Sequence, residues 1–454
     1  MPSEQVSTRD ERTGALLERT KVRGRAIRRR RHFRQSALFA GLLMAAVAAV
    51  LVPTHALRLH SSTTKVTVPG PAGGPVPQGF EPGSTSFIST QIGWTLGSYT
   101  CSARPCVALL RTADGGTTWG AIPAPAPVRA PTGELVGASA VAFADASDGY
   151  AYGTYMNGGD ASILWTTHDG GATWHLVASL LGASPFFIDN LQVTSSHVYM
   201  QFEGWNPTFI PGTSLPEGDD GHYRLAWSSA RTDAFTLLVD LGTPSYAQPG
   251  ADTQTGSVGG YPHLATVEGD RAFIVGNDEL TIFDGTRFTS TGLGQLASDP
   301  VCADTIADLV ASSATDLVAE CGRGVGGGSM GARELYGTTD DGEHWVRLPD
   351  PPQAPYDDCG LTDAGQGHAS LCGTSAGGSV LFVTGDFART WHTGLSFSGD
   401  GGAYFGDLQF EDPLHGAVIH APGSAFSSTP TAPPVLYLTS DGGFHWWPVH
   451  FDSR

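Results

Sequence analysis

The octapeptide TADGGTTW, residues 112–119, recurs along this 454-residue chain. Four close variants follow it, namely THDGGATW (167–174), TTDDGEHW (338–345), TGDFARTW (384–391) and TSDGGFHW (439–446). Two degraded copies, SSARTDAF (228–235) and FDGTRF (283–288), lie between them. The terminal aromatic residue therefore appears seven times, at separations of 46 to 61 residues. A period of this length is typical of the blades of a propeller.

The composition of the octapeptide leaves three interpretations, which are a phosphate loop, a calcium loop and a tight turn. A phosphate loop needs a following helix and a basic residue, and the octapeptides have neither in common. A calcium loop needs several oxygen ligands at set spacing, whereas the repeated frame supplies one Asp. In a tight turn, Thr and Asp bond to local backbone groups, Gly supplies a positive φ, and Trp returns into the next strand. We therefore predict a structural turn without a bound metal or other cofactor.

Each octapeptide is preceded by two short runs of alternating apolar residues, as in VAFADASDGYAYG (141–153). Such alternation predicts half-buried strands. The second unit then has four strands, VAFAD (141–145), YAYGTY (150–155), SILWTT (162–167) and WHLVAS (174–179), with the octapeptide at the third turn. Seven such units predict an all-β fold, a seven-bladed β-propeller of four-stranded antiparallel blades over residues 84–454.

The octapeptides resemble Asp-box (BNR) repeats, which occur in sialidases, Vps10-type receptors and photosystem II stability/assembly factor-like proteins. The resemblance extends over residues 84–451 and is strongest to the last group. It implies a propeller in which the boxes are structural. The residues assigned to the boxes are Thr112, Asp114, Gly116, Trp119, Thr167, Asp169, Gly171, Trp174, Thr338, Asp340, Gly342, Trp345, Asp386, Trp391, Asp441, Gly443 and Trp446.

The N-terminal part of the chain predicts a membrane segment. Residues 1–35 form a basic tail, because residues 1–36 hold eleven Lys and Arg against four acids. An apolar stretch without charge follows, and we predict a single transmembrane helix over 36–57 with the basic side in the cytoplasm. A cleaved export signal remains the alternative, which would leave a secreted protein. Residues 58–83, rich in Ser, Thr, Pro and Gly, form a spacer.

The exported part of the chain is acidic and contains all six cysteines. The whole chain carries a net charge of −19 although its first 36 residues carry +7, so the remainder carries −26 and is not expected to bind nucleic acid. An even number of exported cysteines predicts disulfides, for which six cysteines allow 15 pairings. Local pairing is the simplest, and it gives Cys101–Cys106, Cys302–Cys321 and Cys359–Cys372.

The longest predicted connections all fall on the face opposite the boxes, because successive turns of an antiparallel sheet alternate between its two ends. Binding residues often lie on such loops. The predicted contacts are Trp205, Asn206, Phe209, Tyr246 and Tyr261, although these rings could equally pack against the propeller. The predicted function is a membrane-anchored module that binds or scaffolds a protein or glycan.

A sialidase-like glycoside hydrolase is the alternative function. Sialidases on this fold need three clustered arginines, a Tyr nucleophile with a Glu partner, and an acidic proton donor. No catalytic residue is assigned, because Arg111, Arg287 and Arg389 lie in or beside box segments and form no predicted cluster. An enzyme is therefore the less favoured interpretation.

Overall fold

The computed structural model describes residues 73–451 of the chain, apart from several short gaps. The gaps are 103, 130–134, 156–160, 178–186, 204–221, 243–262, 268–270, 277–278, 294–295, 297–305, 323–332, 350–356, 366–367, 376–377, 387–388, 399–403 and 423–431. These residues belong to one compact unit, Thr67–Arg454. No helix among them has the length and apolar character needed to cross a bilayer. The predicted anchor, 36–57, lies outside the described residues, so it remains a prediction.

The described chain forms seven four-stranded antiparallel sheets, which we number 1 to 7 in chain order. Their strands, in order, are β1 (Glu81–Phe87), β2 (Gly93–Cys101), β3 (Arg104–Thr112) and β4 (Gly120–Ile122); β7 (Ala140–Phe143), β8 (Gly149–Tyr155), β9 (Ala161–Thr167) and β10 (His175–Leu176); β11 (Phe187–Val193), β12 (His197–Glu203), β13 (Tyr223–Ser229) and β14 (Thr236–Gly242); β15 (His263–Val267), β16 (Arg271–Gly276), β17 (Glu279–Phe283) and β18 (Phe288–Gly292); β19 (Ile306–Ala311), β20 (Leu317–Gly322), β21 (Arg333–Thr338) and β22 (Val346–Arg347); β23 (Asp357–Gly365), β24 (His368–Ser375), β25 (Gly378–Thr384) and β26 (His392–Ser398); and β27 (Tyr404–Phe410), β28 (Gly416–Ala421), β29 (Val435–Thr439) and β30 (Trp447–Pro448). A small hairpin of β5 (Val128–Arg129) and β6 (Leu135–Val136) lies between sheets 1 and 2 in the chain.

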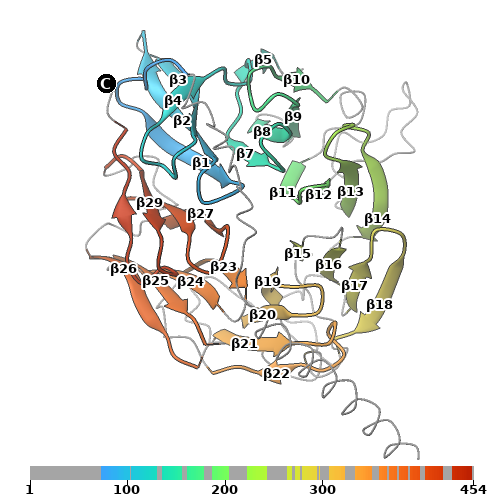
Figure 1. Ribbon diagram of the computed structural model, residues 1–454. Coiled ribbons are helices and arrows are strands. Elements are labelled where there is room, and N and C mark those ends of the chain that lie inside the picture. Colours follow the sequence, from blue (N-terminus) through green and yellow to red (C-terminus); the bar gives the residue numbers. More distant parts are fainter. Residues whose placement is uncertain are drawn as a thin grey trace, which may run out of the picture. The chain divides into compact units, whose positions relative to one another are not determined.

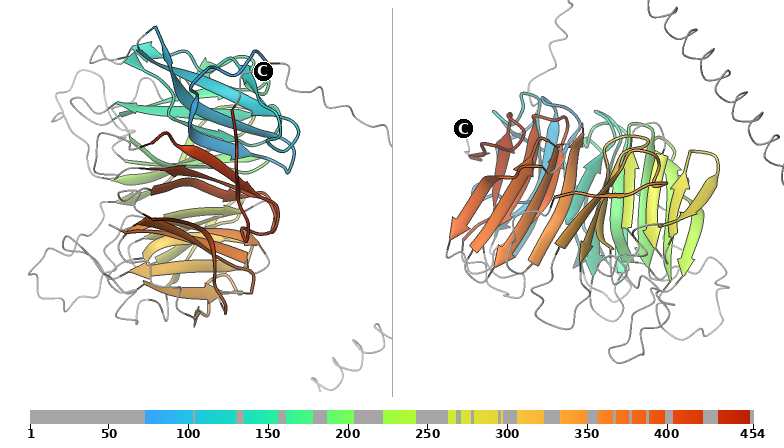
Figure 2. Two further views of the ribbon diagram at one scale, coloured as in Figure 1. Left: turned by 90° about the vertical axis from the view of Figure 1, so that its left-hand side faces the viewer. Right: turned by 90° about the horizontal axis from the view of Figure 1, so that it is seen from below.

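The sheets are arranged radially around an axis, with the first strand of each sheet innermost (Figure 1). Neighbouring inner strands contact one another around the axis, and β1 of sheet 1 contacts β27 and β28 of sheet 7. The strands run between two faces of this arrangement (Figure 2). The predicted all-β propeller of four-stranded antiparallel blades is therefore confirmed.

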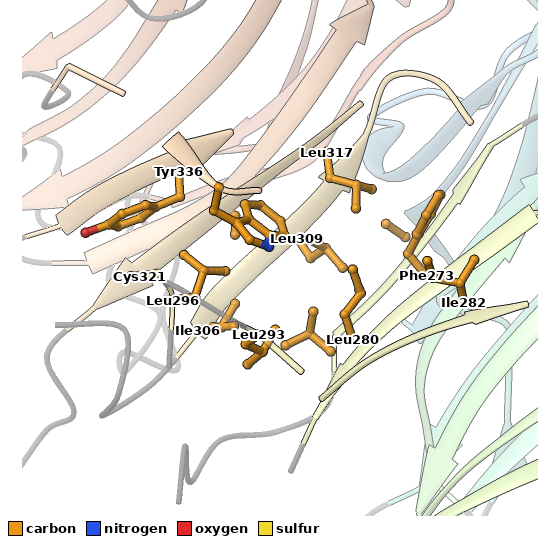
Figure 3. Packing of buried hydrophobic residues seen from close by; sticks show 14 residues of the cluster. Phe273, Leu280, Ile282, Leu293, Leu296, Ile306, Leu309, Leu317, Cys321 and Tyr336 are labelled. Atoms are coloured by element: carbon orange, nitrogen blue, oxygen red, sulfur yellow. The ribbon is translucent and has the colours of Figure 1, made fainter. Parts of the chain in front are cut away.

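Each sheet packs its apolar side chains against the next sheet. Between sheets 4 and 5, Phe273 and Leu280 pack with Leu309 and Leu317 (Figure 3). Between sheets 1 and 2, the fully buried Trp94 stacks on Phe143 with ring centroids 3.7 Å apart. Burial of these large side chains between sheets is the main source of stability of the ring.

Both ends of the described chain pack on sheet 1. Gly74 forms an antiparallel bridge with Ala121 of strand β4. The ring of Phe80 lies 5.0 Å from that of Phe451 near the C-terminus, and Phe451 lies 5.6 Å from Trp119 of the first box. Sheets 1 and 7 each consist of one continuous stretch of chain, so no strand is shared between them.

We call the two faces of the ring the box face and the loop face. The box face carries the turns between the first and second strands and between the third and fourth strands of each sheet. The strand ends joined by the other connections lie at the loop face, and the connections 204–221, 243–262 and 423–431 lie outside the described residues.

Candidate functional site

The inner strands enclose a channel along the axis of the ring, with a volume of about 700 Å³. Residues of β1, β7, β11, β15 and β27 line it. Many of the lining side chains carry hydroxyl, amide or carboxyl groups, including Ser84, Ser86, Gln192, Thr266, Asp407 and Gln409. A concave site with converging polar groups is the usual form of a binding site, so this channel is the candidate functional site.

Side chains of one inner strand bind backbone groups of the next inner strand. The Ser84 hydroxyl accepts a hydrogen bond of 3.1 Å from the Val141 N–H. Two residues further along, the Ser86 hydroxyl accepts one of 2.9 Å from the Phe143 N–H. These N–H groups point away from β8, the strand that pairs with β7. The two serine hydroxyls therefore provide acceptors for backbone donors on the unpaired edge of sheet 2.

The same arrangement joins sheet 7 to sheet 1. The Asp407 carboxylate accepts a hydrogen bond of 2.7 Å from the Thr85 N–H. The side-chain oxygen of Gln409 accepts one of 3.3 Å from the Phe87 N–H. The channel wall is thus held together across the point where the first and last sheets meet.

The joint between sheets 3 and 4 uses an amide side chain instead. The Gln192 amide nitrogen donates to the Leu264 carbonyl at 2.6 Å. Its amide oxygen accepts from the Thr266 hydroxyl at 3.0 Å. Because an amide both donates and accepts, one residue bridges two positions of the neighbouring strand.

The charged residues of the described channel lining, Asp407 and Glu411, are both acidic. Asp407 is accessible from the channel, but surrounding protein raises the pKa of its carboxyl group above the usual value. Burial raises the pKa of Glu411 to about 8. Burial, and then the nearby charge of Asp407, raises the pKa of Tyr152 to about 12. The channel therefore favours ligand groups that donate hydrogen bonds or carry positive charge over anionic groups.

The five predicted contact residues lie outside the described residues, so they remain a prediction. Trp205, Asn206 and Phe209 lie in 204–221, and Tyr246 and Tyr261 lie in 243–262, all outside the described residues. The strands that flank them place these two connections on the loop face, where the channel also ends.

The five complete boxes share a pattern of hydrogen bonds to the aspartate, which is clear in the second box. The Thr167 hydroxyl donates to Asp169 Oδ1 at 2.9 Å and accepts from the Gly171 N–H. The Thr173 N–H donates to the same oxygen at 2.8 Å, and the Thr173 hydroxyl donates to Oδ2 at 2.6 Å. Both oxygens of the box carboxylate are therefore occupied by groups of its own turn. Gly171 has a φ of 94°, a conformation that favours glycine.

The equivalent bonds to the box carboxylate are made in the other four complete boxes. In each of them the threonine hydroxyl two residues before the aspartate and the N–H four residues after it both donate to Oδ1 of the aspartate, which is Asp114, Asp340, Asp386 or Asp441. Three of the five box tryptophans, Trp119, Trp174 and Trp446, donate their indole N–H to a backbone carbonyl.

One box brings together three groups of the kinds that ligate metals. The ligand atoms of Asp340, Glu343 and His344 lie within 4.8 Å of one another. The His344 ring nitrogen, however, is already 2.7 Å from Asp340 Oδ2. The last box makes the same bond between His445 and Asp441 without an acidic residue between them, so this contact belongs to the turn.

The disulfide Cys101–Cys106 is present, as predicted, and it closes the hairpin of β2 and β3 at the loop face. Cys321 is also disulfide-bonded, and its predicted partner Cys302 lies outside the described residues. The backbone register pairs Asp358 with Gly373, which places Cys359 and Cys372 on adjacent strands. Their predicted pairing remains a prediction.

The three arginines considered for a sialidase-like site lie in three different sheets. Arg111 of sheet 1 lies over the Trp94 ring, with its guanidinium carbon 5.6 Å from the ring centroid. Arg287 of sheet 4 binds Asp284 at 3.1 Å, and Arg389 belongs to the box of sheet 6. The described structure does not bring these three residues together.

No protein-family model and no curated protein sequence matches this chain. Among solved structures, YCF48 bound to a D1 peptide is similar over 81% of this chain and 95% of that chain, with 15% identity and a TM-score of 0.43. YCF48 from Cyanidioschyzon merolae is similar over 84% of this chain and 88% of that chain, with 14% identity and a TM-score of 0.31. An ulvan lyase of polysaccharide lyase family PL25 is similar over 83% and 96% of the two chains, with 11% identity and a TM-score of 0.46. The function proposed below rests on the residues of this chain.

The residues of the channel wall are not among the predicted contact residues. Polar residues at alternate positions of the innermost strands are the sequence feature that could have indicated the channel. They are Asp407, Gln409 and Glu411 in sheet 7 and Ser84 and Ser86 in sheet 1. In a half-buried strand such positions are expected to face solvent. In the closed ring they face the axis and the neighbouring inner strand.

Proposed function

We propose that this chain is a membrane-anchored, extracytoplasmic binding or scaffolding module, in which the seven sheets are the seven blades of one ring. The observation that carries the proposal is the polar axial channel, whose wall is built from rigidly hydrogen-bonded inner strands. Its partner is a protein or a glycan that engages the loop face and places a neutral or positively charged group at the mouth of the channel. The chain is anchored through residues 36–57, with the propeller outside the cell membrane.

The charge of the channel supports this proposal over the sialidase-like alternative. A sialic acid carries a carboxylate, and an enzyme that acts on it must offer positive charge. The described channel lining instead offers Asp407 and Glu411. The described lining offers a carboxylate ligand no cationic side chain to pair with, so its desolvation there would be uncompensated.

Proximity labelling with the full chain in its native membrane tests the proposal. The variant combines Trp205→Ala, Asn206→Ala and Phe209→Ala on the loop face. The matched control is Trp447→Ala on β30, where the side chain is 44% exposed and lies away from that face. Loss of a labelled partner in the triple variant but not in the control supports binding at the loop face.

Two other outcomes would contradict the proposal. If the triple variant and the wild type label the same partners, the loop 204–221 is not the binding element. If the purified full chain hydrolyses sialosides, and a channel carboxylate variant abolishes the turnover, the glycosidase alternative replaces the binding module. Membrane anchoring is tested separately by the mass of the mature protein. A cleaved signal would lower that mass by the mass of the N-terminal segment.

A further inference from the structure

We propose that His168, Asp148 and Asp233 form a proton-dependent clasp between sheets 2 and 3, on the box face. The clasp is independent of the ligand proposed above. His168 lies in the second box, Asp148 lies in the turn between β7 and β8 of the same sheet, and Asp233 lies in the turn between β13 and β14 of sheet 3.

Both ring nitrogens of His168 face a carboxylate. Nδ1 lies 2.7 Å from Asp148 Oδ1, and Nε2 lies 3.0 Å from Asp233 Oδ2. A carboxylate only accepts hydrogen bonds, so both contacts are satisfied only when both nitrogens carry a proton. The geometry therefore selects the imidazolium form of His168, which has a charged hydrogen bond at each end.

The residues of the clasp are departures from the repeat. His168 occupies the second position of its box, where the other complete boxes have Ala113, Thr339, Gly385 and Ser440. The degraded box of sheet 3 has Ala230 where the others have the aspartate. Its acidic residue is Asp233 instead, at a φ of 52°, and its side chain reaches across to sheet 2. Sheet 3 thus lacks the turn carboxylate of its own box and supplies one to its neighbour.

Loss of one proton breaks one specific side of the clasp. Asp148 is buried, and its Oδ1 is the closer carboxylate oxygen, so the remaining proton stays on Nδ1. Asp233 Oδ1 keeps hydrogen bonds from the Thr166 hydroxyl at 3.0 Å and the Tyr150 hydroxyl at 3.2 Å. The contact that is lost is the one between Nε2 and Asp233 Oδ2, while the Thr166 and Tyr150 bonds continue to join sheets 2 and 3.

Among the described residues, three other charged groups lie near the clasp. Arg231, 79% exposed, approaches Asp148 Oδ2 at 3.8 Å from the sheet 3 turn. Asp145 binds the backbone N–H groups of Ser147 and Asp148, and Asp169 is occupied within its own box. These groups leave Asp148 and Asp233 as the direct partners of His168.

The electrostatics give the direction of the pH dependence. Burial by itself would lower the pKa of His168, but the hydrogen bonds and charges of Asp148 and Asp233 outweigh it and raise the pKa above 6.5. A raised folded-state pKa means that the clasp contributes its full stability below about pH 6.5 and loses it as the pH rises through the folded-state value.

Histidine NMR on the full chain in detergent tests the clasp. With 13C-labelled histidine, the His168 resonance is assigned by its disappearance in His168→Gln. We expect the wild-type His168 to titrate above the midpoint of an unstructured histidine, and Asp233→Asn to lower that midpoint. A wild-type midpoint at or below that of free histidine would overturn the clasp.

Thermal melting provides the second readout. The melting temperature of the wild type should exceed that of His168→Gln by more at about pH 5.5 than at about pH 8.5. The control is His175→Gln, an exposed histidine of the same sheet, and its difference from the wild type at the two pH values is the baseline for that of His168→Gln. A pH-independent difference for His168→Gln would also overturn the proposal.

Discussion

Replacement of Trp94 by alanine should strongly destabilise the ring. Trp94 is fully buried at the joint between sheets 1 and 2. Its ring stacks on Phe143 at 3.7 Å, with 4° between the ring planes, and its indole N–H donates to the Gly170 carbonyl at 3.2 Å. Truncation of a buried tryptophan to alanine costs about 3–5 kcal/mol, from lost transfer free energy and the cavity left behind.

A second variant separates the contribution of ring packing to stability from that of the indole hydrogen bond. Trp94→Phe keeps an aromatic ring against Phe143 but removes the indole donor from the Gly170 carbonyl. We expect a cost of about 1–2 kcal/mol, from the lost hydrogen bond and the smaller side chain. A double-mutant cycle of Trp94→Ala and Phe143→Ala should give a coupling free energy of about 0.5–1.5 kcal/mol, because the two rings form one aromatic pair.

Urea unfolding followed by far-ultraviolet circular dichroism measures these values without relying on tryptophan fluorescence. Trp447→Ala is the control, since its side chain is 44% exposed, and it should cost less than about 1 kcal/mol. A Trp94→Ala variant whose free energy of unfolding lies within about 1 kcal/mol of the wild type would refute the view that packing between sheets 1 and 2 stabilises the ring.

Three further predictions concern the inner strands, the boxes and the disulfide. Ser86→Ala should lower the free energy of unfolding by about 1–2 kcal/mol in urea titrations, because it leaves the Phe143 N–H without its acceptor; an unchanged value would mean that the serine bond is dispensable. For Asp114, burial alone would raise the pKa, but hydrogen bonds within its box outweigh burial and lower the pKa below 3.8. This carboxylate therefore stabilises the fold above about pH 3.8, and the contribution is lost as the pH falls through the folded-state pKa; Asp114→Asn should flatten the fall of melting temperature in acid, and an unaltered acid profile would count against the box bonds. Replacing Cys101 and Cys106 by serine should lower the free energy of unfolding by about 2 kcal/mol, the loop-closure entropy of a short loop. Equal melting temperatures of the double-serine variant and the wild type would contradict this.

The sequence predicted the architecture because the repeat carries it. The tryptophan-ended turns recur at the spacing of a blade, and the predicted strands of the second unit agree with β7, β8 and β9 to within two residues at each end. The predicted fourth strand, 174–179, is longer than the observed β10, His175–Leu176. Residues 178 and 179 of that predicted strand lie outside the described residues.

The channel and the clasp could not be predicted in the same way. Asp407 and Thr85 are 322 residues apart, and their contact exists only because the last sheet lies beside the first. His168 and Asp233 are 65 residues apart and lie in turns of different sheets. Local periodicity describes how a strand faces its own sheet, and it contains no information about which side chains meet across a joint.

The joint between sheets 1 and 7 has a consequence for engineering the protein. Because each sheet is one continuous stretch of chain, and Phe80 near the start touches Phe451 near the end, the two ends of the ring lie close together. The ends could therefore be linked and the chain cut between any other pair of sheets, giving a circular permutant that keeps every sheet intact.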